Sequence, residues 1–303
     1  MWQIESTYKA RDVEETIDLY FYRPVGYAIA RVSQFLNLSP TGVTIISILV
    51  GMFAGHLFYY TDIQTNVIGM ILLVIAEAMD SADGQLARMT KTFSRAGRFL
   101  DGFGGNLMFV SIYFHICLRT VHGGGSPWIF AVALLSGLSH SFQCAMADYY
   151  RNAYLRFVHG EKRNELEKST TVEQLYQNLR WSEHPVRKFF LRTYLNYTYQ
   201  QEALARNFQR LIAKSESAYG DTVPDWLRKE YAKRNKPLLK YYNFITTNTR
   251  MIALFVSLLV GNVYLYLAFE LIVLNGVLLG ARTYQDRVDL NLLRMIENQE
   301  GNA

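Results

Sequence analysis

Apolar residues in this chain are gathered into long runs, which are separated by polar segments of unequal length. A helix of about 20 apolar residues is long enough to cross the hydrocarbon of a bilayer. Six such segments are expected, at residues 40–60, 64–88, 97–118, 127–150, 242–260 and 262–282. The pattern predicts an all-α, polytopic membrane protein with six transmembrane helices.

The polar segments divide the chain into five parts. These are an N-terminal cytoplasmic and interfacial segment (1–39), the first four spans (40–150), a helical cytoplasmic insertion (151–241), the last two spans (242–282) and a cytoplasmic tail (283–303). Residues 17–37 mix Arg23 and Arg31 with Tyr, Phe, Leu and Val, which is typical of a helix lying in the membrane interface.

Basic residues indicate the orientation of the spans. If the N-terminus is cytoplasmic, only Arg119 of the 31 Lys and Arg residues falls in an external loop. This is a strong positive-inside bias, so both termini are expected in the cytoplasm. The expected location is a bacterial cytoplasmic membrane.

The insertion carries most of the excess positive charge. In the whole chain half of the residues are hydrophobic, yet the mean hydropathy is only +0.01. Polar segments such as the insertion lower this average. Residues 151–242 contain 18 Lys and Arg against 10 Asp and Glu. Helix-like mixtures of basic and apolar residues at 185–194 and 203–214 suit an anionic membrane surface, and a solvated helical hairpin is the alternative. No recognised nucleic-acid-binding module accompanies the charge, so no nucleic-acid partner is expected.

Acidic residues interrupt the second and third apolar runs. Asp80 and Asp83 share a helix face, and Asp101 begins the next run, so the two helices can present three carboxylates to one another. Charged groups in a span are costly and mark functional positions. Hard oxygen ligands of this kind favour a divalent cation, Mg²⁺ or Mn²⁺.

The arrangement resembles the motif of the CDP-alcohol phosphotransferase (CDP-alcohol phosphatidyltransferase) family, Asp-x2-Asp-Gly-x2-Ala-Arg-x8-Gly-x3-Asp-x3-Asp. Seven of its eight fixed positions are present, from Asp80 to Asp101. The last acid, which is the catalytic base in the family, is replaced by Gly105, with Asn106 after it. Weak substitutes for this base are Asn106, Glu77 one turn before Asp80, and His140 in the fourth span.

The resemblance implies transfer of a phosphatidyl or related phospho-alcohol group from a CDP-linked donor, such as CDP-diacylglycerol, to a hydroxyl acceptor, with release of CMP. It assigns the metal to Asp80, Asp83 and Asp101, and it implies a homodimer. The segment Pro40-Thr-Gly-Val-Thr44 resembles the opening of the family's preceding span. The resemblance assigns the nucleotide pocket and the phosphate contacts to small and basic residues of the motif: Gly84, Ala87, Arg88 and Gly97, with Thr44 beside them.

Three functional classes are weighed: an active transferase, a donor-binding relative that is catalytically impaired because of Gly105, and an unrelated transporter. The acids lie at one end of their spans rather than at the midplane, which argues against a transporter. Arg250 in the fifth span either receives the phosphate of an acceptor or pairs with an acid such as Glu270. Synthesis of phosphatidylinositol phosphate or phosphatidylglycerol phosphate is the leading hypothesis. Cys117 and Cys144 are expected to be buried packing residues.

Overall fold

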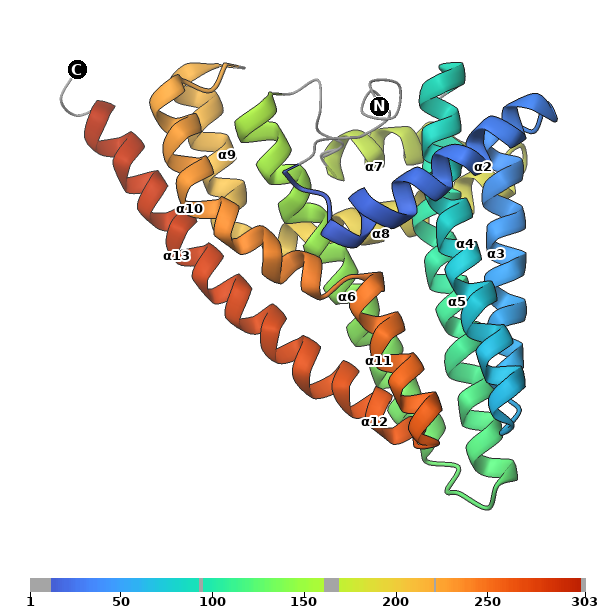
Figure 1. The fold of residues 1–303 in the computed structure, drawn as a ribbon. Coiled ribbons are helices and arrows are strands. Elements are labelled where there is room, and N and C mark those ends of the chain that lie inside the picture. Colours follow the sequence, from blue (N-terminus) through green and yellow to red (C-terminus); the bar gives the residue numbers. More distant parts are fainter. Residues whose placement is uncertain (1–11, 93–94, 161–168, 221, 301–303) are drawn as a thin grey trace. The chain divides into compact units, whose positions relative to one another are not determined.

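The computed structural model describes residues 12–92, 95–160, 169–220 and 222–300 (Figure 1). Within these ranges, seven side chains are not described: Arg95, Ala96, Arg98, Phe99, Asp101, Gly102 and Glu300. Regular structure in the described residues is helical throughout, without strands. The expected all-α class is therefore confirmed.

The chain divides into two compact units. The first unit comprises Met1–Ser141 and Thr247–Val273, and the second comprises Phe142–Thr246 and Leu274–Ala303. Each unit therefore combines a segment from the first part of the chain with one that follows residue 246.

The helices of the first unit are η1 (Asp18–Tyr22), α2 (Arg23–Phe35), α3 (Pro40–Leu57), α4 (Ile63–Thr90), α5 (Arg95–His122), the start of α6 (Ile129–Tyr154), α11 (Thr247–Val260), α12 (Val263–Ala268) and most of η4 (Phe269–Leu274). Local sequence explains several of their ends. The Ser39 hydroxyl accepts the Gly42 N–H at the start of α3, and the Asp62 carboxylate accepts the Thr65 N–H at the start of α4. Such side chains satisfy amide groups that have no partner inside the helix.

Helices α3, α4 and α5 pack at short range because glycines lie at their contacts. A Cβ added to Gly55 would come within 2.9 Å of the backbone nitrogen of Ile112, and one added to Gly51 would overlap the Met108 side chain. Small residues spaced four apart allow membrane helices to approach closely. The Ser111 hydroxyl uses this proximity to donate to the Met52 carbonyl at 2.8 Å.

A buried apolar cluster joins helices α3, α4, α5, α6, α11 and α12 of the first unit. Its fully buried members include Phe58, Leu73, Ile112, Leu254 and Tyr266. The core of this unit is therefore built from the helices that carry the long apolar runs. Both cysteines are free thiols. Cys117 is buried, as expected, whereas Cys144 is only half-buried.

The second unit contains the end of α6, η2 (Leu155–His159), α7 (Ser169–Gln177), α8 (Pro185–Leu204), α9 (Arg206–Tyr219), α10 (Asp225–Phe244) and α13 (Asn275–Glu300). Its core is aromatic. Phe157 stacks on Tyr231 with 4.4 Å between ring centroids, and Tyr150 stacks on Tyr242 at 5.0 Å. Gln285 of α13 donates to Asn235 of α10 at 2.7 Å, which ties these two helices together.

Among the described residues, four helical segments are long and apolar enough to cross a membrane: Pro40–Leu57, Ile129–His159, Asp225–Val260 and Val263–Gln299. They correspond to the first, fourth, fifth and sixth expected spans. The second and third expected spans coincide with α4 and α5, which are not among these four. Charged residues of the motif interrupt the second half of α4, so six spans remain a prediction.

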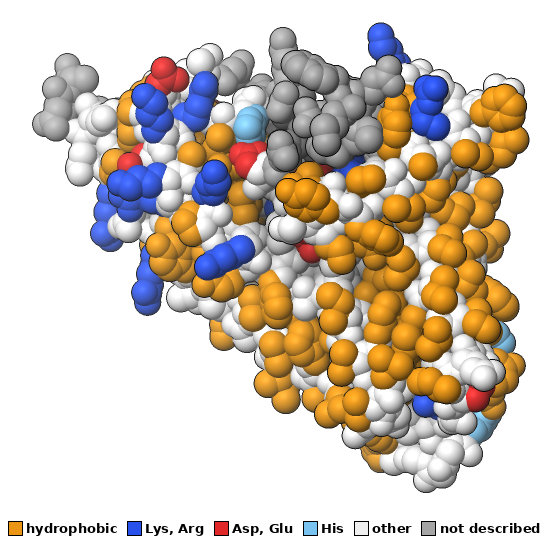
Figure 2. Space-filling view, viewed as in Figure 1, with side chains coloured by type: hydrophobic (Ala, Val, Ile, Leu, Met, Phe, Trp, Pro, Cys, Tyr) orange, Lys and Arg blue, Asp and Glu red, His pale blue; other side chains and the backbone are white. Residues whose placement is uncertain are grey.

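The distribution of side chains on the surface differs along the helices. Hydrophobic side chains cover α3 and the neighbouring part of the first unit, whereas in the second unit Lys and Arg gather over α10 and the second half of α13 (Figure 2). Helix α13 continues to Glu300, so the segment 283–303, expected as a tail, is largely helical. The expected interfacial segment at 17–37 is helical over 18–35, and its location at a membrane surface stays a prediction.

Candidate functional site

The second half of α4 carries the acidic motif. Asp83 is 6% exposed, and its carboxylate accepts a hydrogen bond from the Thr44 hydroxyl of α3, which is 2% exposed. Thr44 also lies 3.1 Å from the Pro40 carbonyl. A carboxylate buried at a helix contact is expensive unless it is hydrogen-bonded, so Thr44 holds Asp83 in a defined orientation.

Asp80 and Arg88 lie on the more accessible part of the same helix, where both are half-buried. The Arg88 guanidinium folds back along α4 toward Gly84. A Cβ added to Gly84 would lie 3.3 Å from the Nη2 atom of Arg88. This agrees with the general tilt of helical side chains toward the N-terminus. The guanidinium therefore covers Gly84, one turn from Asp80, where a phosphate bound near the acids would meet it.

Helix α5 contributes the remaining motif positions. Gly97 is half-buried, and the side chain of Asp101 lies outside the described residues. A Cβ added to Gly105 would meet nothing within 4 Å, whereas one added to Gly104 would lie 2.7 Å from Ile48. A Cβ at the position of the family's last acid would therefore meet no described atom, and Asn106 is exposed beside it.

The chemistry of the donor set fits a hard divalent cation. Asp83 is a buried carboxylate, and Asp80 lies one helical turn away. Among the described residues, no group of three or more His, Cys, Asp or Glu side chains lies close enough to hold a metal ion. Asp101, the third expected ligand, falls outside that set, so the metal site stays a prediction.

Arg250 lies in a separate, fully enclosed polar cluster of the first unit. Its Nε donates to Glu270 Oε1 at 2.8 Å, and both side chains are 0% exposed. His140 Nδ1 lies 3.9 Å from the same carboxylate oxygen and 3.4 Å from the Tyr113 hydroxyl. Tyr266 donates to the Tyr113 hydroxyl at 3.3 Å. The structure thus favours the pairing of Arg250 with Glu270, and it assigns His140 to this cluster.

Glu77 is near the N-terminal segment. Burial, and then the carboxylates of Glu77, Asp18 and Glu15, raise the pKa of the Tyr22 phenol above its usual value. Tyr22 is only 6% exposed. Glu77 therefore lies close to the acids of that segment, and its role as a substitute base stays a prediction.

Two contacts of the N-terminal segment were not expected from the sequence. Asn248 of α11 donates its side-chain amide hydrogens to Glu15 and Asp18, each at 2.9 Å, across more than 200 residues of chain. Gln85, inside the motif, donates to the Arg23 carbonyl at 3.0 Å. No local sequence pattern predicts these contacts, because the partners are distant in sequence and their residue types are common on protein surfaces.

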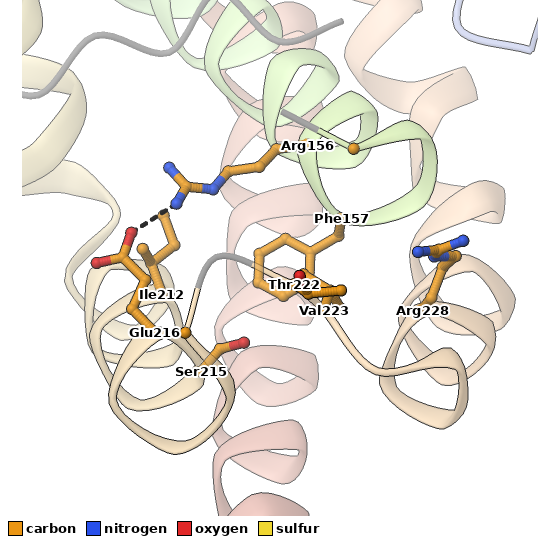
Figure 3. A pocket seen from close by; sticks show the side chains of 10 residues that line it. Arg156, Phe157, Ile212, Ser215, Glu216, Thr222, Val223 and Arg228 are labelled. Atoms are coloured by element: carbon orange, nitrogen blue, oxygen red, sulfur yellow. Dashed lines mark hydrogen bonds and ion pairs between the residues drawn. The ribbon is translucent and has the colours of Figure 1, made fainter. Parts of the chain in front are cut away.

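A further pocket lies in the second unit and contains none of the motif residues (Figure 3). It has a volume of about 130 Å³ and is lined by residues from η2, α9 and the start of α10. Arg156 points toward Glu216 and bonds it at 2.5 Å. Arg156, the most buried cation of the pocket, is therefore already paired with an acid. We do not assign the pocket to the reaction of the motif.

Comparison with known proteins identifies the part of the chain that carries the motif. The model of the CDP-alcohol phosphatidyltransferase family matches residues 37–175. This segment is similar to the CDP-alcohol phosphatidyltransferase domain. The matched segment includes α3, α4, α5 and α6, and thus Thr44 and every motif position from Asp80 to Gly105.

A relative of this domain is an archaetidylinositol phosphate synthase of Pyrococcus horikoshii. It is 34% identical over 100 residues, which are 33% of this chain and 50% of the relative. The chain therefore spans about half the length of that relative. The apolar helices and the CDP-alcohol phosphatidyltransferase domain together point to an integral membrane protein.

Proposed function

We propose that this protein is a phospholipid-synthesising transferase. It moves a phosphatidyl or related phospho-alcohol group from a CDP-linked donor to a hydroxyl acceptor and releases CMP. The observation that carries the proposal is the arrangement on α4, where the buried Asp83 is oriented by Thr44 and the Arg88 guanidinium covers Gly84. Such an arrangement suits a pyrophosphate, which needs positive charge and close approach to a helix backbone.

Each residue has a defined part in this proposal. Asp80, Asp83 and Asp101 would hold Mg²⁺ or Mn²⁺, which when bound neutralises the charge of the donor's pyrophosphate. Arg88 binds a phosphate oxygen, and the small residues Gly84, Ala87 and Gly97 leave space for the cytidine. Thr44 keeps Asp83 in one orientation through its hydrogen bond.

The transfer itself is a substitution at phosphorus. The acceptor oxygen bonds to the phosphorus that carries the donor's alcohol, the bond from that phosphorus to the bridging oxygen breaks, and CMP leaves with that oxygen. The hydroxyl proton must pass to a base. Because Gly105 offers none, proton removal is the slow step of this site unless Glu77 or another group accepts the proton.

The acceptor is proposed to be a phosphorylated alcohol. The relative from Pyrococcus horikoshii is named for synthesis of archaetidylinositol phosphate. Inositol phosphate is therefore the first acceptor to test, for synthesis of a phosphatidylinositol-phosphate type of lipid, and glycerol phosphate is the second. The active site and both termini are further proposed to lie in the cytoplasm, since the basic residues gather on that side. The family resemblance also supports a homodimer.

The decisive experiment is a CMP-release assay on the purified protein with CDP-diacylglycerol and a panel of acceptors, with and without EDTA. Release of CMP that requires both a divalent cation and one acceptor class is expected. CMP release that persists in EDTA would reject the metal site, and equal release without any acceptor would reject group transfer.

A second function is favoured by one observation, the glycine at position 105. The domain would bind the CDP-linked donor without turning it over. Binding of the donor in the presence of Mg²⁺, measured by calorimetry, combined with no CMP release from any acceptor, would identify this case.

A further inference from the structure

Helix α8 of the second unit carries a combination of residues that neither the motif nor the transfer reaction uses. Residues 185–200 contain three basic and five aromatic side chains and no acid. Aromatic and basic residues together are typical of segments that lie where a bilayer meets water.

One face of α8 is fixed against α6. Leu195, Thr198 and Gln201 are buried, and Gln201 Nε2 donates to the Ala145 carbonyl at 2.8 Å. Burial, and then the Asp148 carboxylate, raise the pKa of the Tyr197 phenol. Helix α8 therefore crosses α6 close to residues 145–148.

This crossing point lies at the end of an apolar run. The segment Ile129–His159 has 31 residues, or about 46 Å of helix, which exceeds the hydrocarbon thickness of about 30 Å. Its first Asp, Glu, Lys or Arg is Asp148, which follows a stretch of suitable length for the hydrocarbon. Asp148 is therefore expected near the level at which hydrocarbon gives way to headgroups, and the second half of α8, around Tyr197 and Gln201, packs on α6 at that level.

Helix α7 contacts α8 through Glu173, which accepts from the Tyr199 hydroxyl, but the side of α8 that carries Val186 and Phe189 is exposed. Val186 is 65% exposed and Phe189 is 52% exposed, and Trp181 lies just before the helix with 45% exposure. Arg187 and Arg192 are exposed, and neither forms an ion pair with a described acid. Apolar side chains between two available cations are complementary to an anionic lipid surface.

Lys188, unlike the two arginines, contacts residues that precede α8 in the chain. Its ammonium lies 4.6 Å from the Tyr176 ring centroid and donates to the Leu179 carbonyl at 2.5 Å. The loop before α8 is therefore tied to α7. This leaves Arg187 and Arg192 as the cations that can reach headgroups.

We propose that α8 is an interfacial anchor, which inserts Val186 and Phe189 into the bilayer surface and binds anionic lipid headgroups through Arg187 and Arg192. The anchor holds the insertion against the membrane surface. It does not depend on the proposed transferase activity, because it rests on residues of α8 and α6 that lie outside the motif. Each basic residue near an anionic surface is expected to raise local lipid binding about fivefold.

The test uses the full-length protein in vesicles of phosphatidylcholine with or without phosphatidylglycerol. The photoreactive residue benzoylphenylalanine replaces Phe189, and lipid adducts are measured by mass spectrometry after illumination. Lys229 is the control position, because it is exposed on α10 and about 20 Å of helix before the apolar run at 242. Strong lipid adducts at position 189 and few at 229 are expected.

Charge is tested separately with Arg187→Gln/Arg192→Gln, and Lys229→Gln/Lys233→Gln serves as the charge-matched control. The first pair should lower the preference for phosphatidylglycerol adducts at position 189 by about tenfold or more, and the second should leave it unchanged. Equal adducts at 189 and 229, crosslinks that join two copies of the chain, or adducts indifferent to phosphatidylglycerol would overturn the proposal. Gel filtration and circular dichroism of each variant confirm its fold.

Discussion

Two polar regions of the first unit use charged residues in opposite ways. At the end of α4, Asp80, Gly84 and Arg88 are partly exposed, and open space lies at Gly105 on α5. Around Arg250 and Glu270, by contrast, both charges are 0% exposed and are enclosed by aromatic side chains. In this structure neither side chain of that ion pair is accessible to a substrate. The candidate site is therefore the accessible cluster beside small residues. It is not the most deeply buried pair of charges.

The largest effect is expected where the enclosed pair is broken. Arg250→Ala should lower the free energy of unfolding by about 3–5 kcal/mol, because it leaves the Glu270 carboxylate buried without its cation. Thermal unfolding of the purified protein in detergent measures this. The control Arg250→Met/Glu270→Leu, which removes both charges, should be close to the parent protein. If Arg250→Ala folds normally and instead weakens use of phosphorylated acceptors, Arg250 binds the acceptor phosphate.

Next in size is the accessible cluster. Asp83→Asn should reduce CMP release at least about 100-fold and abolish metal-dependent donor binding. The reason is that the cation lowers the free energy of the transition state by several kcal/mol, by neutralising the charge that develops on the phosphates. Stability should change far less than in Arg250→Ala. Asp62→Asn is the matched control, since Asp62 is an exposed cap on the same helix. Donor binding by Asp83→Asn that equals the parent protein would contradict the metal-site hypothesis.

A gain is expected at the open position on α5. Gly105→Asp should raise CMP release about 100-fold, the lower end of what a placed base contributes. Gly105→Asn fills the same space without a base and should give no gain. Asn106→Asp tests a carboxylate displaced by about 100° around the helix. If neither acid raises the rate and Glu77→Gln abolishes the parent activity, the base lies on α4.

The smallest effect compares two glycines. Gly55→Ala should destabilise the protein by about 1–3 kcal/mol, because its Cβ would press on the backbone of Ile112. Gly105→Ala meets no atom within 4 Å and should be neutral or slightly stabilising. Thermal unfolding of both variants measures the difference. Equal loss of stability in the two would show that the space at Gly105 is not open.

The helical class, the long apolar helices and the motif could be predicted from the sequence, because each depends on residues that are near neighbours. Hydrophobic runs report burial or lipid contact locally, and the spacing from Asp80 to Arg88 places those residues on one stretch of helix. Hydrophobic runs do not fix how far the last helix continues. Its apolar run ends near residue 282, yet α13 continues to Glu300, since packing on α9 and α10 supports the polar part.

Only the tertiary structure decided which distant residues meet. The hydrogen bonds of Thr44 with Asp83 and of Asn248 with Glu15, and the pairing of Arg250 with Glu270, join residues between 20 and 233 positions apart. A sequence lists the groups that can form hydrogen bonds, but burial of many side chains together selects the pairs. The sequence therefore determined the elements and the chemistry available to them. The fold determined which charges are sealed and which remain accessible, because that depends on how the helices pack.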